Sequence, residues 1–209
     1  MNRGRVVNLS GVRVLEILKT NAYSLICFLF LILGVIGGLI LFDDFKWLTN
    51  FCEKFFSNYL SDRQNASYFK IVITSYLQHL LLFLTIFIFG TTLFGVVLVP
   101  TSLSFCGFFY GAGVAYLYSN FALKGVAFNA VIFLPPVILF LLFLVFASKH
   151  AMVFSLNIAR LTLPDTLGQN LFISFKTYAM NLLFLVLGAV SSSLIDALIS
   201  ISLLKFFEF

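Results

Sequence analysis

Charge is the property this sequence lacks most. Only 10% of its 209 residues are charged, whereas 61% are hydrophobic, and the mean hydropathy is +1.08. A water-soluble domain of this size still exposes much of its surface, so it could not bury so much apolar material. The composition therefore excludes a soluble globular protein and indicates one that uses the lipid bilayer as its solvent.

Residues that carry chemistry are also scarce, with only two histidines and three cysteines. The sequence contains no CxxC pair, zinc-ligand spacing, Ser/His/Asp set, Walker loop or dinucleotide fingerprint. We therefore expect no enzyme activity, no cofactor, no metal site and no structural disulfide. Cys27 and Cys106 fall in apolar runs, so an external thiol reagent is expected to reach Cys52 alone. The 13 basic residues form no stripe that would indicate nucleic-acid binding.

Long apolar runs are what the sequence has instead. A helix needs ~20 apolar residues to cross the hydrocarbon core, and these runs show no alternation of polar and apolar residues that would indicate strands. We predict an all-α, polytopic membrane bundle: a single integral membrane domain over residues 1–209, with about five transmembrane helices plus amphipathic interfacial helices. The predicted spans are Ala22–Phe42, Ile71–Val99, Ser102–Ser119, Val126–Ala147 and Tyr178–Leu204.

Basic residues near the span ends predict the orientation, because cytoplasmic loops are enriched in Lys and Arg. Residues 1–21 form a basic segment, and within it residues 12–20 have an amphipathic pattern. This pattern suits a helix on the inner membrane surface or one that docks a cytoplasmic partner. We predict a multi-pass protein of the cell (plasma) membrane with its N-terminus in the cytoplasm and its C-terminus outside. The basic residues assigned to the cytoplasm are Arg3, Arg5, Arg13, Lys19, Lys149, Arg160 and Lys176.

The longest loop, residues 43–70, also has an amphipathic pattern. Its apolar residues repeat at helical spacing, and its polar residues occupy the other face. We predict an interfacial helix on the outer leaflet, which could also be a platform for an external partner, followed by a turn at residues 61–65. The apolar face comprises Leu48, Phe51, Cys52, Phe55 and Tyr59.

The second apolar run is longer than one crossing requires. If Leu80–Val99 crosses the bilayer, then Ile71–His79 lies at the level of the outer headgroups. Pro100 is expected to end the span and to place a tight inner turn at Thr101 and Ser102. His79 has no spaced carboxylate or thiol as a co-ligand, so we interpret it as a headgroup-level histidine.

Small residues in the third span form a stripe at helical spacing. Gly107, Gly111 and Ala115 follow one another at intervals of four, which lets another helix backbone approach closely. The stripe can pack within the bundle or across a homodimer.

A proline pair interrupts the fourth span. Pro135 and Pro136 remove two backbone donors, so we expect a kink or helix break near the middle of the bilayer. Such breaks form substrate sites in transporters, but a mechanical hinge or a packing bend explains the pair equally well.

The last span contains one carboxylate. Asp196 is 20 residues beyond Lys176, or roughly 30 Å along a helix. This distance predicts a position near the outer headgroups. There Asp196 is either an ordinary interfacial carboxylate or a fixed polar contact for another helix or a partner.

From the second span onward the chain resembles stage II sporulation protein M, and the order and spacing of several short elements support the resemblance. Asp196 matches the family's acidic position near the C-terminus. The sequence departs from the family pattern at Pro136-Val137 and at Ser200-Ile201. The matching elements are Phe94-Gly95, Val99-Pro100, Gly107 to Gly113, Lys124-Gly125, Leu134-Pro135 and Leu194 to Ile199.

The resemblance implies a non-enzymatic membrane scaffold in the machinery that remodels peptidoglycan during forespore engulfment. Stage II sporulation proteins D and P would then be its partners, and lipid and a homodimer are further expected contacts. The alternative is a membrane subunit of a transporter that works with a cytoplasmic ATPase. The residues we expect to contact a partner are Lys46, Glu53, Lys54 and Asp196.

Overall fold

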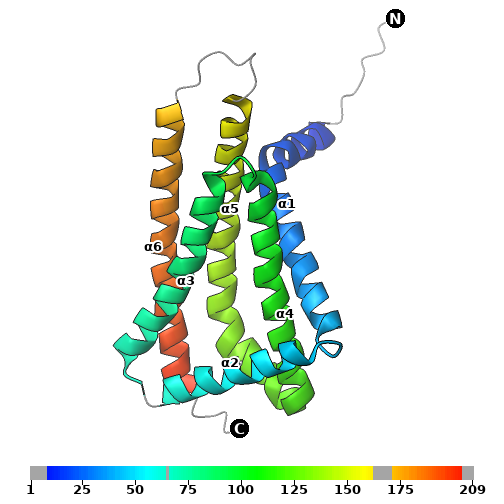
Figure 1. The fold of residues 1–209 in the computed structure, drawn as a ribbon, viewed down its shortest axis with the longest axis vertical. Coiled ribbons are helices and arrows are strands. Elements are labelled where there is room, and N and C mark those ends of the chain that lie inside the picture. Colours follow the sequence, from blue (N-terminus) through cyan, green and yellow to red (C-terminus); the bar gives the residue numbers. More distant parts are fainter. Residues whose placement is uncertain (1–8, 65, 162–170, 204–209) are drawn as a thin grey trace, which may run out of the picture.

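The computed structural model describes residues 9–64, 66–161 and 171–203, and it describes the surroundings of side chains in residues 21–63, 66–160 and 174–203. Within these ranges the fold is all-α and contains no strand, which confirms the predicted class. Five long helices lie side by side, and a sixth, α2, crosses one end of the bundle (Figure 1). The elements are α1 (Leu9–Leu41), α2 (Lys46–Gln64), α3 (Tyr68–Gly90), α4 (Gly95–Phe128), the π-helix η1 (Asn129–Phe133), α5 (Leu134–Leu161) and α6 (Leu171–Leu203).

Four helical stretches are long and apolar enough to cross a membrane: Asn21–Leu41, Tyr68–Gly90, Gly95–Arg160 and Ser174–Leu203. The third is 66 residues long and contains both α4 and α5, which run in opposite directions (Figure 1). The bundle also exposes many large apolar side chains, such as Leu81 (64%) and Leu187 (58%), as expected for surfaces that face lipid. These features support a multi-pass membrane protein.

The predicted amphipathic segment at residues 12–20 lies where the structure describes only the backbone. The helix of α1 begins at Leu9 and continues through this segment without a break into the first span. The surroundings of its side chains lie outside the described residues, as does the structure of residues 1–8.

The turn after the second span lies nearer the N-terminus than the sequence suggested. α3 ends at Gly90, and the chain reverses over residues 91–94. There the Thr91 and Thr92 hydroxyls donate to the Ile88 and Phe89 carbonyls, which have no intrahelical partner at a helix end. The prediction that Pro100 ends the span and that Thr101 and Ser102 form the turn was wrong.

Pro100 lies inside α4, five residues after its first residue, Gly95. It lacks the N–H that would bond the Val96 carbonyl, so it removes one backbone hydrogen bond near the start of the helix. The next two hydroxyls bond their own helix: Thr101 donates to the Val97 carbonyl, and Ser102 donates to the Leu98 carbonyl at 2.7 Å. The helix continues beyond Pro100, which therefore does not terminate the span.

The small-residue stripe of α4 packs against α1 in the same chain. A Cβ atom built on Gly107 or Gly111 would overlap the α1 backbone at Leu31 and Val35. α1 provides a matching pair, because Cβ atoms on Gly34 and Gly38 would overlap the α4 backbone. Ala115, the third member of the stripe, packs against the apolar cluster beneath α2.

The break between α4 and α5 lies at the end of the bundle near α2. The backbone leaves helical geometry at Ala122 (φ 47°, ψ −127°), and the π-helix follows. Pro135 and Pro136 directly follow this π-helix within a continuous helical segment, and a π-helical turn is a common way for a helix to accommodate a local irregularity. The expected irregularity at the proline pair is present as this π-helix, but it lies at the end of the bundle near α2, so the predicted position near the middle of the bilayer was wrong.

Candidate functional site

The amphipathic helix predicted after the first span is α2, and its apolar face packs against the bundle. Leu48, Cys52, Phe56 and Tyr59 are all buried. The Phe56 ring stacks on Tyr116 of α4, with 5.5 Å between ring centroids, and Tyr59 meets Phe133 of η1 edge to face at 5.6 Å. Aromatic contacts therefore fix the middle of α2 across the end of α4 and η1.

Cys52 differs from its prediction because it lies on this buried face. Its side chain is 3% exposed, and burial raises the pKa of the thiol to about 11. Only the thiolate reacts readily with alkylating reagents. The expectation that Cys52 would be the accessible cysteine was wrong.

The C-terminal turn of α2 holds the most polar contact between helices. Arg63 forms an ion pair with Asp196 of α6, and the two side chains are only 9% and 8% exposed. The predicted turn at residues 61–65 was wrong, because α2 continues to Gln64. This extra turn carries the Arg63 guanidinium to the carboxylate.

Hydroxyl groups from three helices complete this polar cluster, which we call the Arg63–Asp196 junction. Ser75 of α3 accepts from the guanidinium at 3.1 Å and donates to Asp196. Tyr59 donates to Asp196 at 3.3 Å, and Arg63 Nε donates to Ser200 Oγ at 3.2 Å. The guanidinium carbon also lies 3.5 Å from the centroid of the Tyr59 ring.

The chemistry of the junction explains why charged groups can lie there. A buried ion pair is maintained only when good geometry and further hydrogen bonds offset the cost of removing both charges from water. Both oxygens of Asp196 have partners, and Arg63 gains a cation–π contact. Burial and the nearby carboxylate raise the pKa of Tyr59, so its hydroxyl remains a donor. The junction therefore fastens α2 to α3 and α6.

The predicted role of Asp196 as a contact for an external partner was wrong, because the side chain is 6% exposed and paired inside the chain. The other role predicted for Asp196, a fixed polar contact for another helix, is the one that the structure shows. Arg63 and Ser75 were not predicted. The available signal was helical spacing, since Tyr59 and Arg63 are one turn apart, as are Asp196 and Ser200.

The three other predicted contact residues lie on the free face of α2. Lys46, Glu53 and Lys54 are exposed, and their neighbours on this face are polar. We call this surface the platform face. It comprises the exposed residues Lys46, Asn50, Glu53, Lys54, Ser57, Asn58, Ser61 and Asp62.

The platform face and the adjoining turn carry a small excess of negative charge. Asp43 and Asp44 in the turn are exposed, and they add two carboxylates to those of Glu53 and Asp62. Lys46 and Lys54 offset two of these four charges. Lys70 at the start of α3 and Lys124 near the end of α4 are also exposed at this end of the bundle, so the four acidic and four basic exposed residues described there balance.

His79 lies within the bundle at one side of the junction. Its Nδ1 is 3.2 Å from Ser193 Oγ, and its ring stacks on Phe140 with centroids 4.1 Å apart. Next to Ser193, Ser192 donates to the Pro136 carbonyl at 2.8 Å. Within the part of the chain that the structure describes, His79 belongs to no cluster of His, Cys, Asp and Glu side chains able to hold a metal ion.

Comparison of the chain with protein-family models, with curated proteins and with solved structures finds no match in any of the three.

Proposed function

We propose that this protein is a non-enzymatic membrane scaffold that holds a partner protein on the platform face of α2. The observation that carries the proposal is the buried Arg63–Asp196 junction. It attaches one end of α2 to α3 and α6, while the aromatic contacts of Phe56 and Tyr59 attach the middle to α4 and η1. A helix held in this way offers its polar face with little conformational freedom to lose on binding.

The site of action follows from the direction of the chain. α1 begins and α6 ends at opposite ends of the bundle (Figure 1), as an odd number of crossings requires. With basic residues 1–21 in the cytoplasm, α2 lies on the outer surface of the cell membrane. The platform face is then directed toward the cell wall.

The partner class rests on the resemblance to stage II sporulation protein M. A scaffold of that kind holds peptidoglycan-remodelling proteins at the membrane during engulfment, and stage II sporulation proteins D and P are the expected partners.

The transporter alternative has less support from the structure than from the sequence. Its main motivation was a helix broken at Pro135 and Pro136 in mid-membrane, but these prolines begin α5 beside α2. A transporter subunit of this kind would depend on a cytoplasmic ATPase, which gives a clear experimental distinction.

Capture of partners from native membranes tests the proposal. The triple variant Lys46→Ala, Glu53→Ala, Lys54→Ala should insert normally and retain little of the cell-wall protein that the wild type retains. Lys176→Ala, a change at an exposed residue at the opposite end, is the matched control and should retain all of it. Recovery of an ATP-binding cassette subunit in place of a cell-wall protein would overturn the scaffold function and support the transporter.

A further inference from the structure

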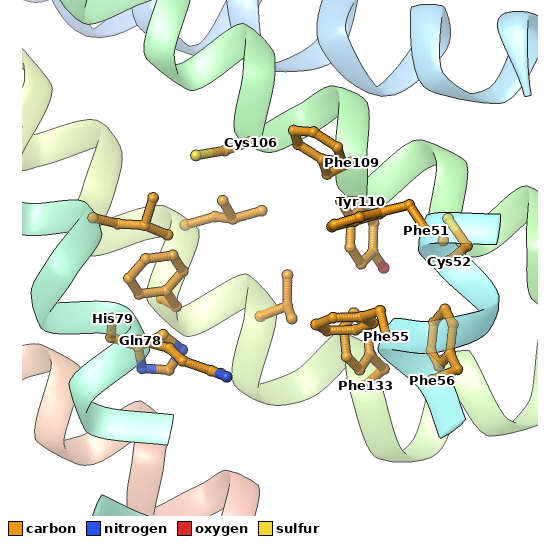
Figure 2. Close-up of a pocket in the computed structure, with 15 residues that line it drawn as sticks. Phe51, Cys52, Phe55, Phe56, Gln78, His79, Cys106, Phe109, Tyr110 and Phe133 are labelled. Carbon is orange, nitrogen blue, oxygen red and sulfur yellow. The ribbon is translucent and has the colours of Figure 1, made fainter. Parts of the chain in front are cut away.

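A cavity of about 300 Å³ lies between α2, α3, α4 and α5, a volume typical of small-molecule sites. Its walls are mainly aromatic. Figure 2 shows Phe51 and Phe55 from α2 on the right with Tyr110 of α4 beside them, Phe109 of α4 at the top, and the polar pair Gln78 and His79 from α3 at the lower left. Aromatic walls with a few convergent polar groups are the usual composition of a ligand pocket.

A second apolar cavity continues from the first along the contact of α3 with α4. It shares Leu82, Cys106 and Phe109 with the first cavity and extends to Ile86 and Phe105. The two together form a groove that suits a molecule with a compact head and a long apolar tail.

Gln78 and His79 are the polar groups that need a ligand. Gln78 is exposed in a membrane-spanning helix, and no described residue bonds its amide. An amide that faces apolar surroundings without a hydrogen-bond partner is unfavourable. The His79 ring contacts Ser193 Oγ through Nδ1 and also bonds the Ala189 carbonyl. These two oxygens are 2.9 Å apart, so both lie on the Nδ1 side and leave Nε2 for a ligand.

The hydrogen bonds of Ser193 determine which tautomer His79 adopts. The Ser193 hydroxyl donates to the Ala189 carbonyl at 2.9 Å, so its oxygen accepts from His79 Nδ1–H. In neutral histidine one ring nitrogen is a donor and the other an acceptor. Nε2 is therefore an acceptor that faces a ligand hydroxyl, beside an amide that can donate or accept.

The polar groups lie close to the Arg63–Asp196 junction. Gln78 is three residues beyond Ser75, a member of the junction, which is roughly 5 Å along the helix. The head of a ligand in this cavity would therefore lie just beneath α2.

We propose that this cavity binds the ring of an isoprenoid quinol. One ring hydroxyl donates to His79 Nε2, the Gln78 amide bonds the other side of the head, the ring lies among the aromatic walls, and the tail follows the groove between α3 and α4. The oxidised quinone lacks the hydroxyl that Nε2 requires and binds more weakly. The site lies on the membrane side of α2, so it is separate from the platform face.

Thermal unfolding of the full chain in detergent, with added decylubiquinol kept reduced, tests the proposal. A ligand that binds only the folded state raises the melting temperature, and we expect a saturable rise of about 5 °C. Decylubiquinone should need about tenfold more ligand for the same shift, the effect of one lost hydrogen bond. Equal shifts with oleic acid, or with quinone and quinol alike, would overturn the assignment.

Variants make the test specific to the two polar groups. His79→Phe preserves a ring against Phe140 but removes Nε2, and Gln78→Leu removes the amide; each should raise the half-saturating quinol concentration about tenfold. Thr74→Val is the matched control, because Thr74 is an exposed polar residue of α3 that bonds only its own helix. Unchanged quinol binding in His79→Phe and Gln78→Leu would overturn the proposal. Should either variant fail to fold, Val137→Phe, which fills the cavity from α5, must abolish the shift.

Discussion

Two contacts hold this bundle together by opposite means. The α1–α4 contact brings two backbones together through glycines on both helices, and the side chains that meet there are apolar. The Arg63–Asp196 junction joins three helices through two buried charges and three hydroxyl groups. Close packing needs only small side chains at the right spacing. A buried ion pair, in contrast, becomes strongly destabilising when either charged partner is removed. The two contacts should therefore respond differently to substitution.

The largest expected effect is at the junction. Arg63→Ala should lower the free energy of unfolding by about 3–5 kcal/mol, because it leaves the Asp196 charge buried and unpaired. The double variant Arg63→Met, Asp196→Leu should recover most of this loss, since two apolar side chains need no partner. Chemical denaturation in detergent measures both. Equal stability of Arg63→Ala and the wild type would contradict a buried pair.

A smaller loss is expected at the α1–α4 contact. Gly111→Leu should cost about 1–3 kcal/mol, because the new side chain would force the backbones apart. Gly38→Ala should also destabilise the bundle, since its Cβ would overlap the α4 backbone. Gly37→Ala is the matched control, because its Cβ would meet only a Phe108 ring atom at 3.8 Å. A wild-type melting temperature for Gly111→Leu would show that the glycine stripe makes no close contact.

Cysteine labelling provides a third test, at the buried face of α2. With its pKa raised to about 11, Cys52 has on the order of one thiolate per thousand molecules at pH 8. Alkylation should therefore be slow at pH 8 and accelerate as the pH approaches 11. A cysteine at Ser57, on the platform face, should react at the rate of a free thiol when Cys27, Cys52 and Cys106 are replaced by alanine. Comparable rates at the two positions would contradict the orientation of α2.

The smallest effect concerns the backbone at the end of α4. Ala122 adopts a positive φ of 47°, a region that costs an L-residue with a side chain about 1–2 kcal/mol and glycine almost nothing. Ala122→Gly should raise the free energy of unfolding by about 1 kcal/mol. Gly125→Ala, three residues away, should lower it, because its Cβ would overlap the Leu117 carbonyl. A loss of stability in Ala122→Gly would show that the turn has another geometry.

The same contrast explains what could be predicted from the sequence. Three features could be predicted because each is a local pattern in the sequence. They are the helical class, the amphipathic character of α2 and the glycine stripe. Arg63 and Asp196 are 133 residues apart, and neither has a nearby residue that identifies its partner. The boundaries predicted from proline were misplaced for another reason. A proline does not always end a helix: α4 continues through Pro100, and a π-helix leads into Pro135 and Pro136 without a break.

A distance measurement tests most directly whether α2 is a fixed platform. Spin labels at Ser57→Cys on α2 and Lys124→Cys near the end of α4, in a chain without its three native cysteines, report the separation of two exposed positions. A fixed α2 predicts a single narrow distance distribution in the parent chain and a broad one when Arg63→Ala is added. A broad distribution in the parent, or a narrow one that Arg63→Ala leaves unchanged, would contradict the central claim that the buried Arg63–Asp196 junction holds α2 in place.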